Sequence, residues 1–205
     1  VDGLGHAASL LRPPGGRLAQ HSLRPNAVPG PGLARVRLGT VPVLALGVSH
    51  HQATVDDLTR FTACAAQAAD ELRAAPGVRG LITLATCNRC ELYVEADRFH
   101  ETVRTAHRLL AAAGAGDLLN IVAARAARSA VEHLFAVACG LDSMVVGESE
   151  VVGQVRSALS ADGSSNSPAL HRLFQMALAT SKVVASTTTI GSLGRSVTSV
   201  ALDLV

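Results

Sequence analysis

Apolar and polar positions after residue 40 alternate with two different periods along the chain. Short apolar runs bounded by turn residues are typical of strands, whereas apolar residues every three to four positions indicate amphipathic helices. A Gly directly after such a pattern, as at Gly114, ends a helix. The sequence therefore predicts strands at 43–48, 81–86, 91–96 and 118–123, and helices at 54–75 and 98–113.

The order of these elements is β-α-β-β-α-β, which predicts an α+β fold with a ferredoxin-like sheet and helices on one face. Three further helical patterns predict additional C-terminal helices. The first would start with a capping box between Ser129 and Glu132, and its apolar stripe leaves His133 away from the core. The last would start at Ser167, with Pro168 in the first helical position.

The two ends of the chain differ from this middle part. Residues 1–40 are rich in Pro, Gly and Arg, and their one acidic residue is Asp2. Such a segment buries too little apolar surface to offset the entropy lost on ordering, so we expect a disordered or non-native leader. Its composition is consistent with an added leader, with an upstream start and with a transit-like extension. We expect the folded domain at 41–185, and at 186–205 a linker that begins a truncated further domain.

Composition narrows the class of protein. The chain has 205 residues, of which 48% are hydrophobic and 17% charged, enough for one main domain with a substantial core. A net charge of +2 with scattered Arg residues gives no basic surface for coating nucleic acid, and 2% aromatic residues leave little for base stacking. Without an apolar run of about eighteen residues or a secretory leader, we expect a cytoplasmic protein with free thiols and no membrane contact.

Four cysteines raise the question of a metal or redox site. Cys87 and Cys90 form a C-x-x-C pair, but a structural zinc site needs a second close ligand pair. Cys64 and Cys139 are isolated, and His50-His51 are adjacent rather than spaced. A redox pair needs its first Cys at a helix N-terminus, which a turn between strands does not supply. Zinc and redox chemistry are therefore the weaker interpretations, and no metal is expected.

A single nucleophilic thiol fits the turn better. Thr86–Arg89 would present Cys87 at the end of a strand, beside a cation that favours thiolate and can hold an anionic substrate. Cys90 shares the strand parity of Leu92 and Val94, so it is predicted to be a core residue. A purely structural Cys87 stays open on composition alone.

At this point the sequence resembles a known family, glutamyl-tRNA reductase. The resemblance covers about residues 43–205 and depends most on the specific G-L-D-S-M-V-x-G-E-x-x-V-x-G-Q-V run. Its four stretches are LALGVSHHQATV (44–55), the T-C-N-R-x-E-[IL]-Y turn (86–93), EHLFAVACGLDSMVVGESEVVGQVRSA (132–158), and LFQMALATSKVV with the T.IG and SV that follow it (173–197).

The resemblance implies an NADPH-dependent oxidoreductase of tetrapyrrole (5-aminolevulinate) biosynthesis. Cys87 would attack the ester of glutamyl-tRNA to give a thioester, which NADPH reduces to glutamate-1-semialdehyde. Arg89 would pair with the substrate's α-carboxylate, and His133 would assist proton transfer or serve as a structural histidine. The resemblance implies that Thr86, Ser143 and Gln154 line the glutamate pocket and that Asn88 and Glu148 also bind substrate. Ser143 and Gln154 could instead cap or bridge helices, and Glu148 could favour a helix start.

The resemblance also implies binding partners, and an NADPH-binding domain that this sequence does not include. NADPH would be bound by a domain absent from this chain, because no GxGxxG or GxxxxGK[ST] is present. The implied partners are glutamyl-tRNA, glutamate-1-semialdehyde aminotransferase and a second copy in a homodimer, and a plastid location would apply if residues 1–40 were a transit segment. His51 stands where the family usually has Lys or Arg. A non-catalytic tRNA- or partner-binding fragment, or a regulator, stays open as the alternative, and this chain alone is expected to lack the reductase step.

Overall fold

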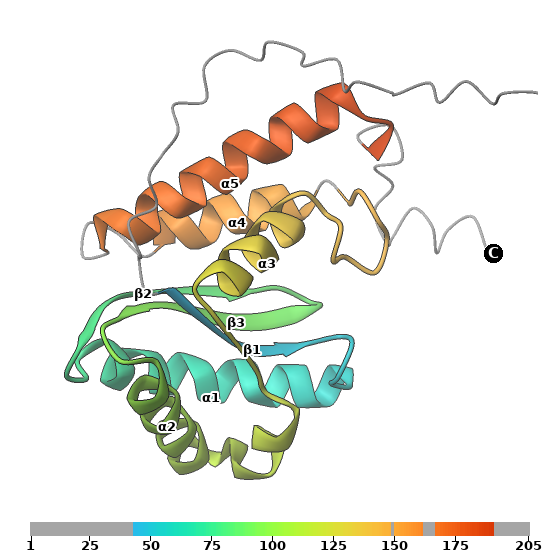
Figure 1. The fold of residues 1–205 in the computed structure, drawn as a ribbon. Helices are drawn as coiled ribbons and strands as arrows, with labels where there is room; N and C mark the ends of the chain where they lie inside the picture. Colours follow the sequence, from blue (N-terminus) through green and yellow to red (C-terminus); the bar gives the residue numbers. More distant parts are fainter. Residues whose placement is uncertain (1–42, 149, 162–166, 191–205) are drawn as a thin grey trace, which may run out of the picture. The chain divides into compact units, whose positions relative to one another are not determined.

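The computed structural model describes residues 43–148, 150–161 and 167–190 (Figure 1). The predicted leader and most of the predicted linker lie outside these residues. The strands are β1 (Val43–Ser49), β2 (Val78–Ala85), β3 (Arg89–Ala96) and β4 (Ala123–Ala126). The helices are α1 (Val55–Arg73), α2 (Phe99–Leu110), α3 (Arg128–Ala138), α4 (Glu150–Ala161) and α5 (Pro168–Thr187), with a π-helical turn η1 (Ala111–Ala115) and a 3₁₀ turn η2 (Gly116–Ile121) before β4.

The four strands form one antiparallel sheet in the order β2-β3-β1-β4. The predicted α+β class is confirmed. At Gly47, which pairs with Glu91, the two central strands approach so closely that an added Cβ would lie 2.1 Å from the Cys90 carbonyl oxygen. Only glycine allows this approach, because any other residue would push β1 away from β3.

Each face of the sheet is covered by different helices (Figure 1). On one face, α1 and α2 pack over an apolar cluster that includes Cys90, Leu92 and Val94 from β3. On the other face, α3, α4 and α5 enclose a second cluster that contains Tyr93 from the same strand. Cys90 is fully buried, so the prediction that it is a core residue is confirmed.

The fourth strand lies further along the chain than predicted. Residues 118–123 were expected to form it, but η2 occupies most of that run and β4 begins at Ala123. Gly114 has a φ of 104°, which turns the chain and lets Leu118 enter the core beside α1. Asp117, at the start of η2, also pairs with Arg60 of α1 at 2.5 Å. Burial of Leu118 in a helical turn thus overrides the strand-like run of apolar residues.

The helix starts show one wrong and one confirmed prediction. No Ser129–Glu132 capping box forms, because α3 already begins at Arg128, whose Nε donates to Glu132 at 2.6 Å. Ser167 caps α5 as predicted, with its hydroxyl accepting a bond from the Leu170 amide at 2.9 Å. In the described part of the chain, no helix combines the length and apolar character needed to cross a membrane.

Candidate active site

The turn between β2 and β3 holds Cys87 at an exposed tip. The Thr86 amide donates to the Arg89 carbonyl at 2.8 Å, and the Thr86 hydroxyl accepts from the amides of Asn88 and Arg89 at 3.1 and 3.2 Å. This side-chain bonding is a common way to fix a tight turn. The His50 amide donates to the Asn88 carbonyl at 2.8 Å, which ties the turn to the end of β1. Thr86 and Asn88 therefore shape the backbone that carries the thiol.

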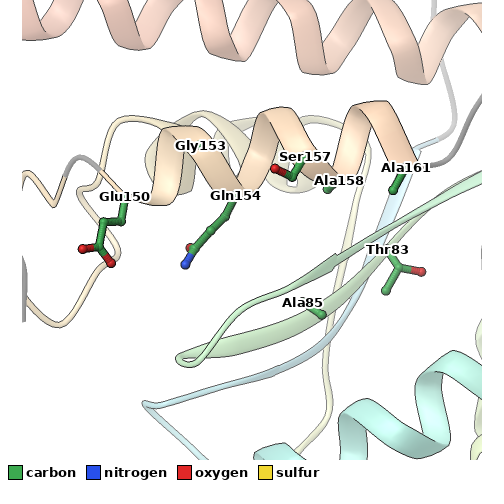
Figure 2. Close-up of a pocket in the computed structure, with 8 residues that line it drawn as sticks. All are labelled: Thr83, Ala85, Glu150, Gly153, Gln154, Ser157, Ala158 and Ala161. Carbon is green, nitrogen blue, oxygen red and sulfur yellow. The ribbon is translucent and has the colours of Figure 1, made fainter.

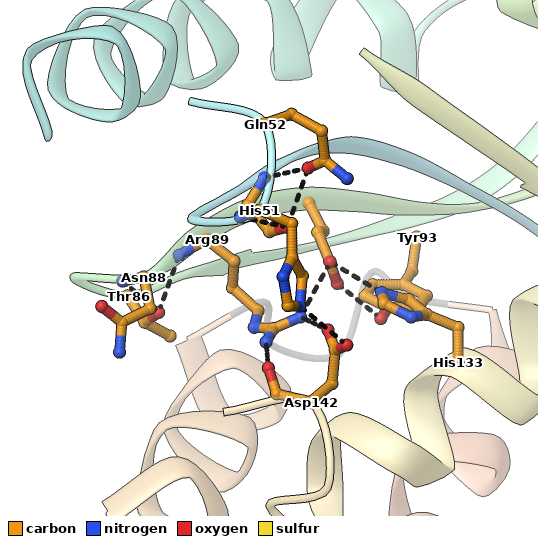
Figure 3. A network of polar contacts seen from close by, with 10 residues as sticks. His51, Gln52, Thr86, Asn88, Arg89, Tyr93, His133 and Asp142 are labelled. Carbon is orange, nitrogen blue, oxygen red and sulfur yellow. Dashed lines mark hydrogen bonds and ion pairs between the residues drawn. The ribbon is translucent and has the colours of Figure 1, made fainter. Parts of the chain in front are cut away.

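Arg89 opens β3 and is buried beneath the loop between α3 and α4, with only 1% of its surface exposed. Its Nη1 donates to Glu91 Oε1 at 3.2 Å and to Asp142 Oδ2 at 2.8 Å, and its Nη2 donates to the Asp142 carbonyl (Figure 3). Burial alone would lower the pKa of Arg89, but the charges of Glu91 and Asp142 raise it above its ordinary value. The guanidinium is therefore a fixed cation.

Glu91 connects Arg89 to two further side chains. Its Oε1 also contacts His133 Nε2 at 2.7 Å, and its Oε2 accepts a bond from the Tyr93 hydroxyl at 2.7 Å. Burial acts to raise the pKa of Glu91, but the hydrogen bond and charge of His133 and the charge of Arg89 outweigh it and lower the pKa. Glu91 is therefore a carboxylate that orients a cation and an imidazole at once.

His133 lies closer to the core than its sequence pattern predicts. Only 9% of its side chain is exposed, because the ring leaves α3 toward the sheet and meets Glu91. The apolar stripe that placed it away from the core covers the helix packing but not this polar contact. Within the described residues no hydrogen bond joins His133 to Cys87, so the two predicted catalytic residues are linked only through Glu91, Arg89 and the turn.

The loop between α3 and α4 presents Asp142 to Arg89. Its two ends meet where the Gly147 amide donates to the Gly140 carbonyl at 3.0 Å, and both glycines have positive φ. The other oxygen of Asp142 lies 3.2 Å from His51 Nε2. Burial would raise the pKa of Asp142, but the hydrogen bond and charge of Arg89 lower it. Position 51 thus contacts this loop.

The remaining predicted residues lie along the same loop and on α4. Ser143 follows Asp142 and is half-buried, and Glu148 at the end of the loop is buried. Burial, and then the nearby charge of Glu150, raise the pKa of Glu148. Gln154 lies on α4 and borders an open groove of about 500 Å³ between α4 and the edge strand β2 (Figure 2). The groove is lined by Thr83, Ala85, Glu150, Gly153, Gln154, Ser157, Ala158 and Ala161.

The two thiols of the C-x-x-C pair occupy different environments. Cys87 is exposed, whereas burial raises the pKa of Cys90 to about 11. Across residues 43–148, 150–161 and 167–190, no group of three or more His, Cys, Asp or Glu side chains is placed to hold a metal ion.

Sequence reasoning missed three members of the network: Glu91, Tyr93 and Asp142. The first two could have been found, because Arg89, Glu91 and Tyr93 alternate along one strand and must share a face. Asp142 lies 53 residues from Arg89 in the sequence, so no local sequence pattern could predict their contact.

Known proteins match this chain at the level of the family and of the fold. A family model described as "Glutamyl-tRNAGlu reductase, N-terminal domain" matches residues 46–188. The chain is 43% identical over 170 residues to the glutamyl-tRNA reductase of Micrococcus luteus, covering 79% of this chain and 37% of that protein. A solved structure of glutamyl-tRNA reductase from Methanopyrus kandleri superposes with a TM-score of 0.57 at 29% identity, covering 71% of this chain and 35% of that one.

The chain thus spans little more than a third of the length of either relative. The match nevertheless includes the hairpin, the loop between α3 and α4, and the whole of α5. This chain therefore belongs to the glutamyl-tRNA reductase family and corresponds to its N-terminal domain.

Proposed function

We propose that this chain catalyses the thiol step of glutamyl-tRNA reduction, with Cys87 as the nucleophile. The observation that carries the proposal is an exposed thiol on a hydrogen-bonded turn, two residues before a buried, permanently charged arginine. The Cys87 thiolate would attack the ester carbonyl carbon, and the bond to the ribose oxygen would break. The tRNA would leave as the free alcohol after taking up a proton, and the glutamyl group would remain as a thioester.

Arg89 is proposed to bind the substrate's free carboxylate. The resemblance implied the α-carboxylate, but that group is esterified in glutamyl-tRNA. The γ-carboxylate is therefore the one that remains for the planar, bidentate guanidinium. The Asp142 carboxylate already accepts from Arg89 Nη1 at 2.8 Å. The incoming γ-carboxylate would therefore compete with Asp142 for the same donor.

His133 is proposed to exchange a proton near the reacting ester. Its Nε2 is occupied by Glu91 at 2.7 Å, so Nδ1 is the atom left for this exchange. Glu91 would act as a positioning residue, because it holds both the imidazole and the guanidinium.

The reductive step is proposed for protein outside these residues. The sequence contains neither GxGxxG nor GxxxxGK[ST], so no residue of this chain is assigned to NADPH. Homodimerisation, the aminotransferase partner, the cytoplasmic location and the domain boundaries at 41–185 stay predictions.

Thioester trapping tests the proposal. The chain is incubated with glutamyl-tRNA carrying labelled glutamate, quenched in acid and digested, and the acylated peptide is identified by mass spectrometry. We expect label on Cys87, no label in Cys87→Ser, and unchanged label in the matched variant Cys90→Ala. Binding of tRNA without acylation would instead favour the non-catalytic binding fragment.

A further inference from the structure

The carboxylate of Asp142 lies between two donors from different parts of the chain. Its Oδ2 accepts a bond from Arg89 Nη1 at 2.8 Å, and its Oδ1 accepts one from His51 Nε2 at 3.2 Å. Figure 3 shows the His51 ring and the Arg89 guanidinium converging on this one carboxyl group. The two donors together therefore form a binding position for a carboxylate, and Asp142 fills that position in this structure.

We infer that this position binds the γ-carboxylate of the glutamyl substrate, with His51 as a second binding residue beside Arg89. Asp142 is then the group that the substrate displaces. The inference rests on the proposed function, which assigns the γ-carboxylate to Arg89 alone. It adds His51 as a residue that contributes to the choice of substrate.

Asp142 covers Arg89 on the side that faces solvent. Of the Asp142 side chain 27% is exposed, whereas only 2% of the Arg89 side chain is. A carboxylate from solution therefore cannot reach the guanidinium while Asp142 stays in place. The other carboxylate on Arg89 belongs to Glu91, which is buried and is also held by His133 and Tyr93. Asp142 is thus the partner that a substrate can replace.

The exchange keeps the buried charges balanced. Arg89 is paired with two carboxylates, those of Glu91 and Asp142, and a γ-carboxylate in place of Asp142 leaves the number unchanged. A buried cation that loses a carboxylate without replacement is strongly destabilised. A glutaminyl substrate offers only a neutral carboxamide at this point, so it compensates the guanidinium less well. The position therefore selects glutamate over its nearest neutral analogue.

The loop after β1 holds His51 at this position. The His50 amide donates to the Asn88 carbonyl at 2.8 Å, which fixes the start of the loop beside the turn that carries Cys87. The rings of His50 and His51 also pack together, with their centroids 4.0 Å apart. Of the His51 side chain 52% is exposed, so its Nε2 can meet a ligand that arrives from solvent.

Two matched esters test the inference. Binding of glutamate α-methyl ester and of glutamine α-methyl ester is measured by amide NMR titration in the Cys87→Ser variant, which lacks the nucleophilic thiol. We expect His51→Ala to weaken binding of the glutamate ester about fivefold, the upper range for one half-exposed ion pair, and to leave the glutamine ester unchanged. The matched control is His171→Ala, at an exposed histidine of α5, which should change neither affinity.

Asp142→Asn should give the opposite change. It neutralises the carboxylate that competes with the substrate, so we expect the glutamate ester to bind about fivefold more tightly. A variant that merely damaged the fold would bind the ester more weakly. Tighter binding therefore separates a displaced group from a structural one.

The inference and the proposed function can fail separately. The inference is overturned if the glutamate ester does not bind, if His51→Ala leaves its affinity unchanged or weakens both esters equally, or if Asp142→Asn binds it more weakly. Thioester trapping tests the proposed function. If the glutamate ester binds as expected but Cys87 is never acylated, the chemistry fails and the carboxylate position stands. If Cys87 is acylated but His51→Ala changes neither affinity, the chemistry stands and this inference fails.

Discussion

The two faces of the sheet receive alternate residues of the same strand but are stabilised differently. On the α1 and α2 face, β3 contributes Cys90, Leu92 and Val94 to an apolar cluster. On the other face it contributes Arg89 and Glu91, which pair with groups from α3 and the loop after it. The period of two thus lets eight consecutive residues serve both packing and chemistry.

Removal of a side chain has a different consequence on each face. On the apolar face, a deleted side chain leaves a cavity. On the polar face, a deleted partner leaves a buried charge without compensation. Variants of one strand can therefore separate the two effects.

Thiol labelling should show the largest difference between the faces. With a pKa of about 11, only about one in a thousand Cys90 thiols is ionised at pH 8, and the side chain is fully buried. We expect Cys87 to react with iodoacetamide at least about a thousand times faster than Cys90, and faster than Cys64 or Cys139. Peptide mapping of timed samples measures the labelling rate of each cysteine. Comparable rates for all four cysteines in the folded chain would contradict the expected difference between the exposed turn and the buried face.

Arg89→Ala should cause the largest loss of stability. It removes a buried cation between two carboxylates, so we expect the free energy of unfolding to fall by about 4 kcal/mol. Urea denaturation followed by circular dichroism measures it. The matched control is Arg98→Ala, whose side chain is 78% exposed beside Glu101, and it should cost less than about 1 kcal/mol. Equal losses in the two variants would show that burial of the pair is not the cause.

Leu92→Ala should cost slightly less and leave the chemistry intact. A cavity in the apolar cluster is expected to lower the free energy of unfolding by about 3 kcal/mol. The rate at which Cys87 is alkylated should not change, because Leu92 points away from the polar face. A clear change in that rate, measured on protein that is still folded, would mean that the two faces are coupled.

The pH dependence of Glu91 should give the smallest effect. Its pKa is lowered in the folded chain, so its contribution to stability is complete above the unfolded value of about 4.3 and is lost as the pH falls through the folded value. We expect the unmodified chain to lose stability more steeply than Glu91→Gln as the pH falls below about 4.3. Urea denaturation at a series of pH values gives the free energy of unfolding of both chains as a function of pH. If that free energy falls equally steeply in both, Glu91 does not have a lowered pKa in the folded chain.

Local sequence signals predicted much of this fold. The first three strands, the hairpin, the parity of Cys90 and the cap at Ser167 all depend on residues close together in the chain. The polar network could not be predicted in the same way. His133 meets Glu91 across 42 residues and Asp142 meets Arg89 across 53, so only the packing of α3 and its loop on the sheet creates those contacts.

The close approach of the central strands at Gly47 has a consequence for any survey of substitutions. Three residues after Gly47, the His50 amide holds the Asn88 carbonyl beside Cys87. A side chain at position 47 would force β1 from β3 and so pull this anchor from the turn. In a mutational scan scored by activity, Gly47 would be as intolerant as the nucleophile itself although it touches no substrate, and its intolerance would measure the geometry of the sheet.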